Sequence, residues 1–315
     1  MIDRRLPLGI DLGEARVRVA GLRRRGAALE LLGVGTAEVQ GDVRESLSVA
    51  LKQLDVREAH AVAMIRSCDA RLRVIRLPAL SRRDLQRAAR FEGVASFGTE
   101  EPVAVRSLVL SERGDQRKMV IAAARMRTVQ TTLQILKASG LKPVRIDHEG
   151  CALARNTDGA ILDIGLNRSS LVAVNDGIPV VRTMALGGFF FTKALAEALG
   201  TTYQLAEIRK ITIGLAGAAA DAVREFCSRV AVEISDLRER DGVVVDRLSL
   251  CGNGARLDCI IPALRDALGV PVLPVGLSRL TAVDLPEQVL DPGVCDWYGA
   301  ISAAMPLSPE TAMVA

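Results

Sequence analysis

The sequence predicts an α/β protein built from two similar lobes, with a small α/β subdomain inserted between them. Three observations support this prediction. A strand–turn–strand segment near the N-terminus is repeated in the second half of the chain. The segment between the two copies alternates strand and helix patterns in the order β-α-β-β-α-β. The chain has 315 residues, of which 49% are hydrophobic, which is enough for more than one core.

The two copies of the repeat align when Asp11 is matched with Asp163. The first reads LGIDLGEARVRVAGLRRRGAALELLGVG and the second reads AILDIGLNRSSLVAVNDGIPVVRTMALGG. In each copy an apolar strand ends at an Asp-x-Gly corner, and two further strands follow, joined by a tight turn. A helix pattern comes next, VRESLSVALKQL or FFFTKALAEAL. We therefore expect two lobes of one design that face each other around a ligand.

The inserted subdomain is expected over residues 73–147. A strand ends at Pro78, and a helix follows with Ser81 as its N-cap and Asp84 completing a capping box. Two strands joined by an Arg-Gly-Asp turn come next, then a helix that ends at Gly140 and a last strand. This order is that of a small ferredoxin-like unit.

Helices dominate the end of the chain. TYQLAEIRKITIG and AAADAVREFCSRVAVEISDLRERDG have amphipathic patterns, and VVDRLSLCGNGA predicts a strand that runs into a Gly-rich corner. A helix, a short strand and a last helix stopped by Pro306 complete the chain.

Composition excludes several classes of protein. The formal charge is only +4, the arginines are spread from Arg4 to Arg279, and aromatic residues make up 3%, so we expect no nucleic-acid partner. The six cysteines form no C-x-x-C pair, which argues for free thiols rather than a zinc site or a disulfide framework. No apolar run approaches the roughly 20 residues of a membrane span, and the N-terminus is no signal peptide, so we expect a cytoplasmic protein.

The two Asp-x-Gly corners are the first candidates for chemistry. A glycine corner lets backbone N–H groups approach phosphate oxygens, and an aspartate beside it can hold hydrated magnesium. Asp11 with Gly13, and Asp163 with Gly165, are therefore expected to hold a nucleotide's phosphates from both sides, with a hydroxyl from Ser169 or Ser170.

A second group of motifs follows the second corner. It consists of a glycine pair before a helix, an acid–base pair three residues apart on one helix face, and a Gly-rich corner between strand and helix, where anions bind well. The residues are Gly187, Gly188, Glu207, Lys210, Gly252, Asn253 and Gly254.

The order of these motifs resembles that of the actin-like ATPase superfamily. The run LGGFFFTKALAEALGTTYQLAEIRK, together with VIRLPALSRRDLQRAARFE, MVIAAAR and ASGLKPVRID in the insert, is similar to the PilM family within the FtsA/PilM branch. The resemblance covers nearly the whole chain. It implies an actin-like fold with two ribonuclease H-like lobes: residues 1–72 with 148–157 and a C-terminal helix 297–307 in lobe one, residues 73–147 in the insert, and residues 158–296 in lobe two.

The resemblance also implies ATP and Mg²⁺ in the cleft. Asp11 and Asp163 would hold the metal ion, and Arg18 stands where the family usually has Lys. It identifies no catalytic residue, so we expect at most a slow ATPase. The residues expected to bind the cofactor are Asp11, Gly13, Arg18, Asp163, Gly165, Ser169, Gly187, Gly188, Glu207, Lys210, Gly252, Asn253 and Gly254.

The partners implied by the resemblance belong to type IV pilus assembly. They are the short cytoplasmic N-terminal peptide of a PilN-like inner-membrane protein, bound through the insert, and other proteins of the pilus platform. The chain would then work at the inner membrane through its partner, without inserting into the bilayer itself.

Three alternatives stay open at this point. Glu14 follows the first corner where the family usually has Ser, Thr or Asn, and Asn253 replaces a middle glycine, so the chain could be an adaptor that binds its partner without nucleotide. An FtsA-like filament-forming protein is the second alternative, and the short tail SPETAMVA, which offers no amphipathic membrane-targeting helix, argues against it. A small-molecule kinase is the third, and the inserted module argues against that.

Overall fold

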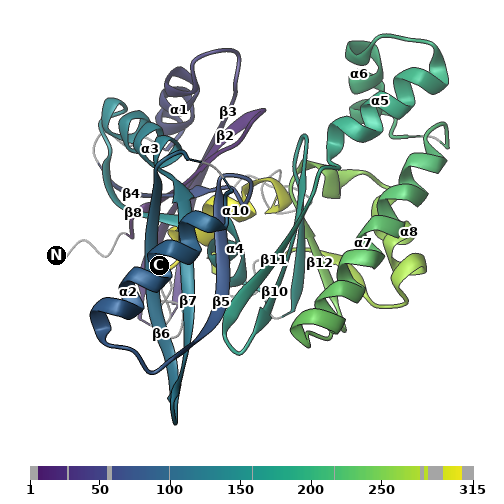
Figure 1. Cartoon of the computed structure of the whole chain (residues 1–315). Coiled ribbons are helices and arrows are strands. Elements are labelled where there is room, and N and C mark those ends of the chain that lie inside the picture. Colours follow the sequence, from purple (N-terminus) through teal and green to yellow (C-terminus); the bar gives the residue numbers. More distant parts are fainter. Residues whose placement is uncertain are drawn as a thin grey trace.

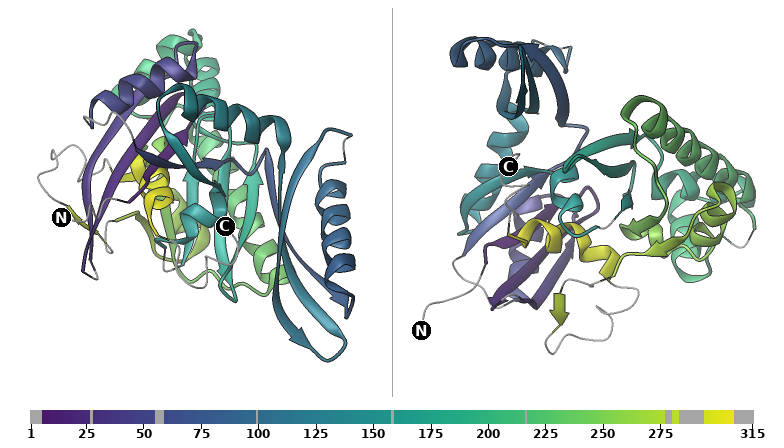
Figure 2. Two further views of the ribbon diagram at one scale, coloured as in Figure 1. Left: turned by 90° about the vertical axis from the view of Figure 1, so that its left-hand side faces the viewer. Right: turned by 90° about the horizontal axis from the view of Figure 1, so that it is seen from below.

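The structure is a computed structural model that describes residues 6–26, 28–54, 59–98, 100–157, 159–215, 217–276, 280–282 and 294–306. Two lobes lie side by side, and a smaller subdomain projects from the first lobe (Figures 1 and 2). The tail SPETAMVA and the last residue of the expected C-terminal helix lie outside the described residues.

Lobe one is built on a sheet with the strand order β14-β3-β2-β1-β4-β8. Strands β1, β2 and β3 form an antiparallel meander, and β4 and β8 add parallel strands beyond β1. The alternating apolar residues Ile10, Val17 and Val19 pack under α1 and α3. The elements are β1 (Leu8–Leu12), β2 (Arg16–Arg25), β3 (Ala28–Glu38), α1 (Val43–Lys52), β4 (His60–Ile65), α3 (Met126–Ala138), β8 (Lys142–His148) and β14 (Leu280–Ala282).

Lobe two repeats this design, with the strand order β11-β10-β9-β12-β13. Strand β9 is antiparallel to β10 and parallel to β12, just as β1 is to β2 and β4. Asp163 pairs with Ser170 where Asp11 pairs with Arg18, so the predicted repeat is confirmed. The elements are β9 (Ala160–Ile164), β10 (Ser169–Asn175), β11 (Ile178–Met184), α5 (Gly188–Leu199), α6 (Tyr203–Thr212), α7 (Ala220–Asp241), β12 (Leu248–Cys251), the 3₁₀ helix η1 (Asn253–Arg256), α8 (Ile260–Leu268) and β13 (Val272–Pro274).

The inserted subdomain is smaller than the expected residues 73–147. Its sheet has the order β5-β7-β6 and is covered on one face by α2, which begins after the predicted N-cap Ser81. The expected last strand, β8, instead pairs in parallel with β4, and Leu136 of α3 lies in the core of lobe one. The elements of the insert are β5 (Ala70–Pro78), α2 (Arg82–Ala95), β6 (Val103–Arg113) and β7 (Gln116–Arg125).

Helix α10 (Val294–Ala304) lies at the junction of the two lobes and starts three residues before the expected position 297. It packs closely on β1, because a Cβ on Gly9 would lie only 1.8 Å from Ala300 O. At its other end, Tyr298 belongs to the core of lobe two and Cys295 O accepts a hydrogen bond from Gly252 N. This helix also packs against α4 (Glu149–Ala154) at this junction.

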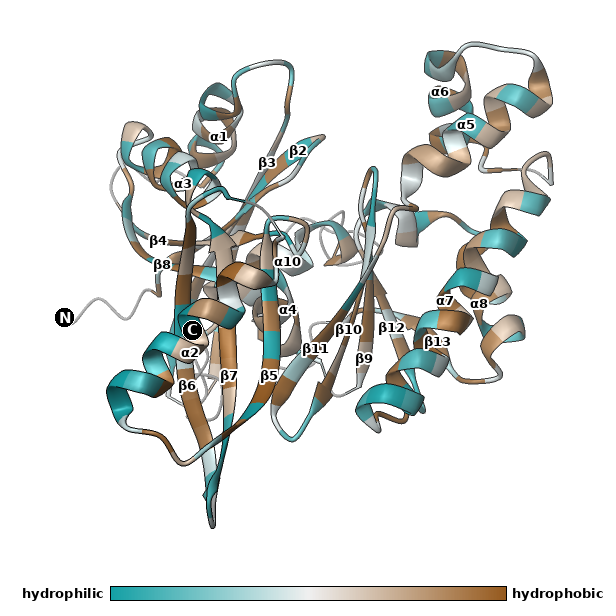
Figure 3. Cartoon of the chain, viewed as in Figure 1, coloured by the Kyte–Doolittle hydropathy of each residue, from teal (hydrophilic) through white to brown (hydrophobic). Residues whose placement is uncertain are grey.

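The helices that cover the sheets carry both hydrophilic and hydrophobic residues, as α2 and α7 show in Figure 3, which is the composition of amphipathic helices. Within the described part of the chain, no helix combines the length and apolar character needed to cross a membrane. Cys151, Cys227, Cys251 and Cys295 are buried, and all six cysteines are free thiols, as expected.

Candidate functional site

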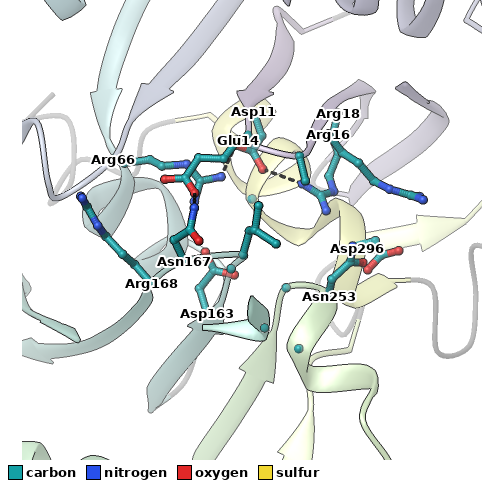
Figure 4. Close-up of a pocket in the computed structure, with 18 of the residues that line it drawn as sticks. Asp11, Glu14, Arg16, Arg18, Arg66, Asp163, Asn167, Arg168, Asn253 and Asp296 are labelled. Atoms are coloured by element: carbon teal, nitrogen blue, oxygen red, sulfur yellow. Dashed lines mark hydrogen bonds and ion pairs between the residues drawn. The ribbon is translucent and has the colours of Figure 1, made fainter. Parts of the chain in front are cut away.

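A cavity of about 640 Å³ opens between the two lobes, and most residues predicted from the sequence line it (Figure 4). One Asp-x-Gly corner lines it from each lobe, and the Gly-rich corner that follows β12 lines it as well. Ser169 and Gly187 are absent from the lining. The predicted residues that line it are Asp11, Gly13, Arg18, Asp163, Gly165, Gly188, Glu207, Lys210, Gly252, Asn253 and Gly254.

The first corner is held by two arginines. Asp11 ends β1 and is buried; its Oδ2 lies 3.5 Å from Arg18 Nη1, the nitrogen of its cross-strand neighbour. Its Oδ1 lies 3.3 Å from Arg66 Nη2. Gly13 is required here, because a Cβ would lie 2.4 Å from Arg16 O. Both carboxylate oxygens of Asp11 therefore face guanidinium groups.

Arg66 is a pocket residue that the sequence did not indicate. It directly follows β4, and the parallel pairing of β4 with β1 brings it to the same sheet edge as Asp11. Burial opposes its charge, but the carboxylates of Asp11, Glu149, Asp163 and Glu14 outweigh that effect and raise the pKa of Arg66. Arg66 is therefore a permanent cation among four carboxyl groups.

The second corner carries a carboxyl group of altered acidity. Burial raises the pKa of Asp163 to about 6, against the opposing influence of the Arg66 charge. Ser170, which pairs with Asp163 across the strands, lines the pocket. Ser169 is fully buried and donates to Leu186 O at 2.6 Å, so of the two serines considered from the sequence, Ser170 is the one at the cavity.

The two glycines at the start of α5, Gly187 and Gly188, have different roles. A Cβ on Gly187 would lie 2.5 Å from Leu166 O, so this glycine permits the close approach of the β11–α5 turn to the second corner. Gly188 N donates to Gly165 O at 2.8 Å. A Cβ on Gly188 would lie 3.6 Å from Gly165 O and from Lys210 Nζ, which is ordinary van der Waals contact, so Gly188 is not required by close approach as Gly187 is.

Lys210 joins α5 to α6 at the wall of the pocket. Its Nζ donates to Gly188 O at 2.9 Å and to Thr192 Oγ1 at 2.7 Å, and it pairs with Glu207 Oε2 at 2.7 Å. The Thr192 hydroxyl also bonds to Glu207. The predicted acid–base pair is thus a buried lysine in a satisfied network rather than an exposed surface pair.

The Gly-rich corner is shaped by backbone geometry. Gly252 has φ +80°, and a Cβ there would lie 2.4 Å from Asp163 Oδ1, so this corner packs directly against the second Asp-x-Gly corner. A Cβ on Gly254 would lie 2.1 Å from Ile164 Cγ2. The Asn253 amide, oriented with its nitrogen toward the carboxylate, donates to Asp296 at 3.1 Å, so its side chain points toward α10.

Glu149 is a second pocket residue that the sequence did not indicate. It is the first residue of α4, and only 3% of its surface is exposed. Its Oε2 accepts a hydrogen bond from Ser67 N at 3.1 Å, and its Oε1 has no hydrogen-bond partner among the described residues. This arrangement leaves one buried carboxylate oxygen available at the pocket.

The geometry does not fit a magnesium ion bound directly by Asp11. Magnesium takes oxygen ligands at about 2.0–2.1 Å in an octahedron, and both oxygens of Asp11 already face arginine nitrogens. Among the residues that the structure describes, no group of three or more His, Cys, Asp and Glu side chains is placed to hold a metal ion. Asp163 lies at the other corner, in lobe two (Figure 4).

A phosphate-bearing ligand fits better. The cavity lies within the range of about 300–1,000 Å³ that is usual for small-molecule sites. Arg18, Arg66 and Arg168 supply guanidinium groups from both lobes to its lining, and guanidinium groups bind phosphate oxygens in a bidentate manner. Glycine corners on each side keep side chains out of the space between them.

Comparison with solved structures shows that the fold is actin-like, as the sequence analysis expected. A chain of the PilM–PilN type IV pilus biogenesis complex is similar, with a TM-score of 0.81, 23% identity, and coverage of 96% of this chain and 98% of that one. The ethanolamine utilization protein EutJ from Carboxydothermus hydrogenoformans has a TM-score of 0.59 and 15% identity, with coverage of 97% and 91%.

The comparison with curated proteins found no match. The model of the family described as type IV pilus assembly protein PilM matches residues 9–288, which is most of the chain. This chain therefore belongs to the PilM family of type IV pilus assembly proteins.

Proposed function

We propose that the pocket between the lobes binds the phosphates of ATP, and that its occupancy controls the binding of a membrane partner's peptide. One observation carries the proposal: two Asp-x-Gly corners and a Gly-rich corner, from three separate stretches of the chain, line one cavity together with Arg18 and Arg66. Membership of the PilM family supports a role for this switch in pilus assembly.

The proposed partner is a PilN-like inner-membrane protein whose short cytoplasmic N-terminal peptide binds at the insert. The likeness to a chain of a PilM–PilN complex supports this choice. On this proposal the chain works in the cytoplasm, is held at the inner membrane by that partner, and contacts other proteins of the pilus platform.

A route for coupling runs from the pocket to the insert. Strand β10 starts at the second corner and ends at the β10–β11 turn, where Asp176 Oδ2 lies 3.1 Å from Lys118 Nζ on β7. A movement of lobe two on nucleotide binding is thereby passed to the sheet of the insert. Hydrolysis of ATP is expected to be slow and to use Glu149, whose Oε1 is unpartnered among the described residues, to orient water.

The test is calorimetric titration of the partner's N-terminal peptide with and without ATP. ATP is expected to change the peptide affinity by about 5- to 150-fold, the usual range of coupling between sites. Lys118→Ala should reduce this ratio, while the affinity for ATP alone and the affinity for the peptide alone stay unchanged. Lys137→Ala, which changes an exposed lysine on α3, should leave the ratio unchanged. Peptide affinity that ignores ATP contradicts the proposal and favours the adaptor without nucleotide.

A further inference from the structure

The guanidinium group of Arg66 lies between the two Asp-x-Gly corners. Nη2 lies 3.3 Å from Asp11 Oδ1, and a Cβ on Gly13 would lie 3.2 Å from the same nitrogen. Nη1 faces the other corner, where a Cβ on Gly165 would lie 3.5 Å away. Figure 4 shows the side chain reaching into this space, beside Glu14. One side chain thus touches both corners that would hold a nucleotide's phosphates.

The charges around Arg66 are those that usually surround a bound cation. Asp11, Glu14, Glu149 and Asp163 all act on it, and their combined attraction keeps it protonated despite burial. A phosphate chain brought next to four carboxylates would be repelled unless a positive charge stood between them. Arg66 supplies that charge from within the chain.

Arg66 also has N–H hydrogen-bond donors besides the one that Asp11 engages. A guanidinium carries five N–H groups in one plane. Nη2 is engaged by Asp11, whereas Nε is buried and has no hydrogen-bond partner among the described residues. Nη1 lies beside the second corner, 3.5 Å from where a Cβ on Gly165 would be. The group can therefore hold Asp11 and still donate to a phosphate oxygen.

We infer that Arg66 is the built-in cation of this site, that it joins the two corners to the phosphates, and that it removes the need for a divalent metal ion. A metal ion and a guanidinium repel each other and would compete for the same space beside Asp11. This inference rests on the proposed binding of nucleotide. It adds that the binding is independent of magnesium and that Arg66 is the cause.

The experiment is equilibrium binding of a fluorescent ATP analogue to the full chain, once in excess magnesium and once in excess EDTA. Wild-type affinity is expected to be the same or tighter in EDTA. Arg66→Ala should weaken binding in EDTA by about 10- to 100-fold, as expected for a lost charge-assisted hydrogen bond, and should recover part of the loss when magnesium is added. Arg44→Ala, an exposed arginine at the start of α1, serves as the control.

A further variant separates charge from folding. Arg66→Lys keeps the positive charge, so its binding should stay independent of magnesium while the affinity falls. Circular dichroism of each variant checks the fold. Wild-type binding that disappears in EDTA overturns the inference and leaves the proposed function intact. No wild-type binding in either buffer overturns the proposed function, and this inference with it.

Discussion

Glu14 Oε2 of lobe one accepts a hydrogen bond of 2.6 Å from Asn167 Nδ2 of lobe two. Each residue closely follows an Asp-x-Gly corner, so this bond joins the lobes at the rim of the pocket. It also shows how a carboxylate is accommodated at the proposed nucleotide pocket: Glu14 turns toward the amide of Asn167 and lies close enough to Arg66 for their charges to attract.

The first prediction concerns this bridge. Asn167→Asp places two carboxylates face to face, and their repulsion should hold the lobes further apart. Small-angle X-ray scattering of the free protein should give a larger radius of gyration for Asn167→Asp than for the neutral control Asn167→Ala. Because salt screens the repulsion over about 10 Å at 0.1 M, the difference should shrink as salt is added. Equal radii at low salt would contradict the bridge.

The second prediction concerns Lys210, which we expect to hold α5 and α6 together. Lys210→Met removes a buried ammonium from three oxygen partners and should lower the free energy of unfolding by about 2 kcal/mol. Lys193→Met is the matched control, because Lys193 and Glu197 form an exposed pair at 3.9 Å that contributes about 0.5 kcal/mol or less. Urea unfolding measures both, and equal losses would argue against the network.

The sequence predicted those site residues that belong to a repeated motif. Asp11 and Asp163 share a motif, a strand and a following turn, so matching one copy to the other located both corners. Arg66 and Glu149 have no such motif. They reach the pocket because β4 and β8 pair in parallel beside β1, which brings the residues that follow those strands to one sheet edge.

The insert is a second case in which strand pairing could not be predicted from the sequence. The order β-α-β-β-α-β was predicted correctly, and it fits either a separate four-stranded unit or a three-stranded unit whose last strand joins another sheet. The difference depends on the pairing of Ile65 with His148, two residues far apart in the sequence. Hydrophobic periodicity does not show which sheet a strand enters.

The third prediction concerns pH. The pKa of Asp163 is raised from its ordinary 3.8 to about 6, because burial penalises the ionised form. The folded state therefore prefers the protonated group, and the contribution of Asp163 to stability should fall as pH rises from about 4 to about 6. Asp163→Asn, which has no charge to bury, should gain stability relative to the wild type over this range, by no more than about 3 kcal/mol.

Chemical unfolding of both proteins at several pH values measures this difference. Taking the difference removes the contribution of His148, whose pKa is lowered to about 4 by burial and which acts in the opposite direction. A difference that stays constant between pH 4 and pH 7 would show that Asp163 is not buried as described.

The fourth prediction concerns stability away from the pocket. Asp147 is fully buried between Arg145 and Arg155, each with a nitrogen 2.7 Å from one of its oxygens. Both arginines also donate to backbone oxygens of α10, at Ala303 and Ser302, so this cluster fixes the helix at the lobe junction.

Asp147→Ala leaves the buried charge of Arg155 and the partly buried charge of Arg145 without their carboxylate and should cost about 3–5 kcal/mol. Glu92→Ala, which removes an exposed pair with Arg73 at 3.8 Å, should change the stability by less than about 1 kcal/mol. Thermal unfolding compares the two variants, and a loss for Asp147→Ala no larger than that for Glu92→Ala would contradict the role of the cluster.

The central claim is that the cavity between the lobes binds a nucleotide, and calorimetric titration with ATP tests it most directly. Gly188→Val adds atoms to the pocket wall, where a Cβ would already lie 3.6 Å from Gly165 O and Lys210 Nζ, whereas Gly276→Val adds them where no heavy atom lies within 4 Å. We predict that the wild type and Gly276→Val bind ATP alike and that Gly188→Val binds at least about tenfold more weakly. Absence of wild-type binding at millimolar ATP, or equal affinities for all three proteins, would contradict the claim.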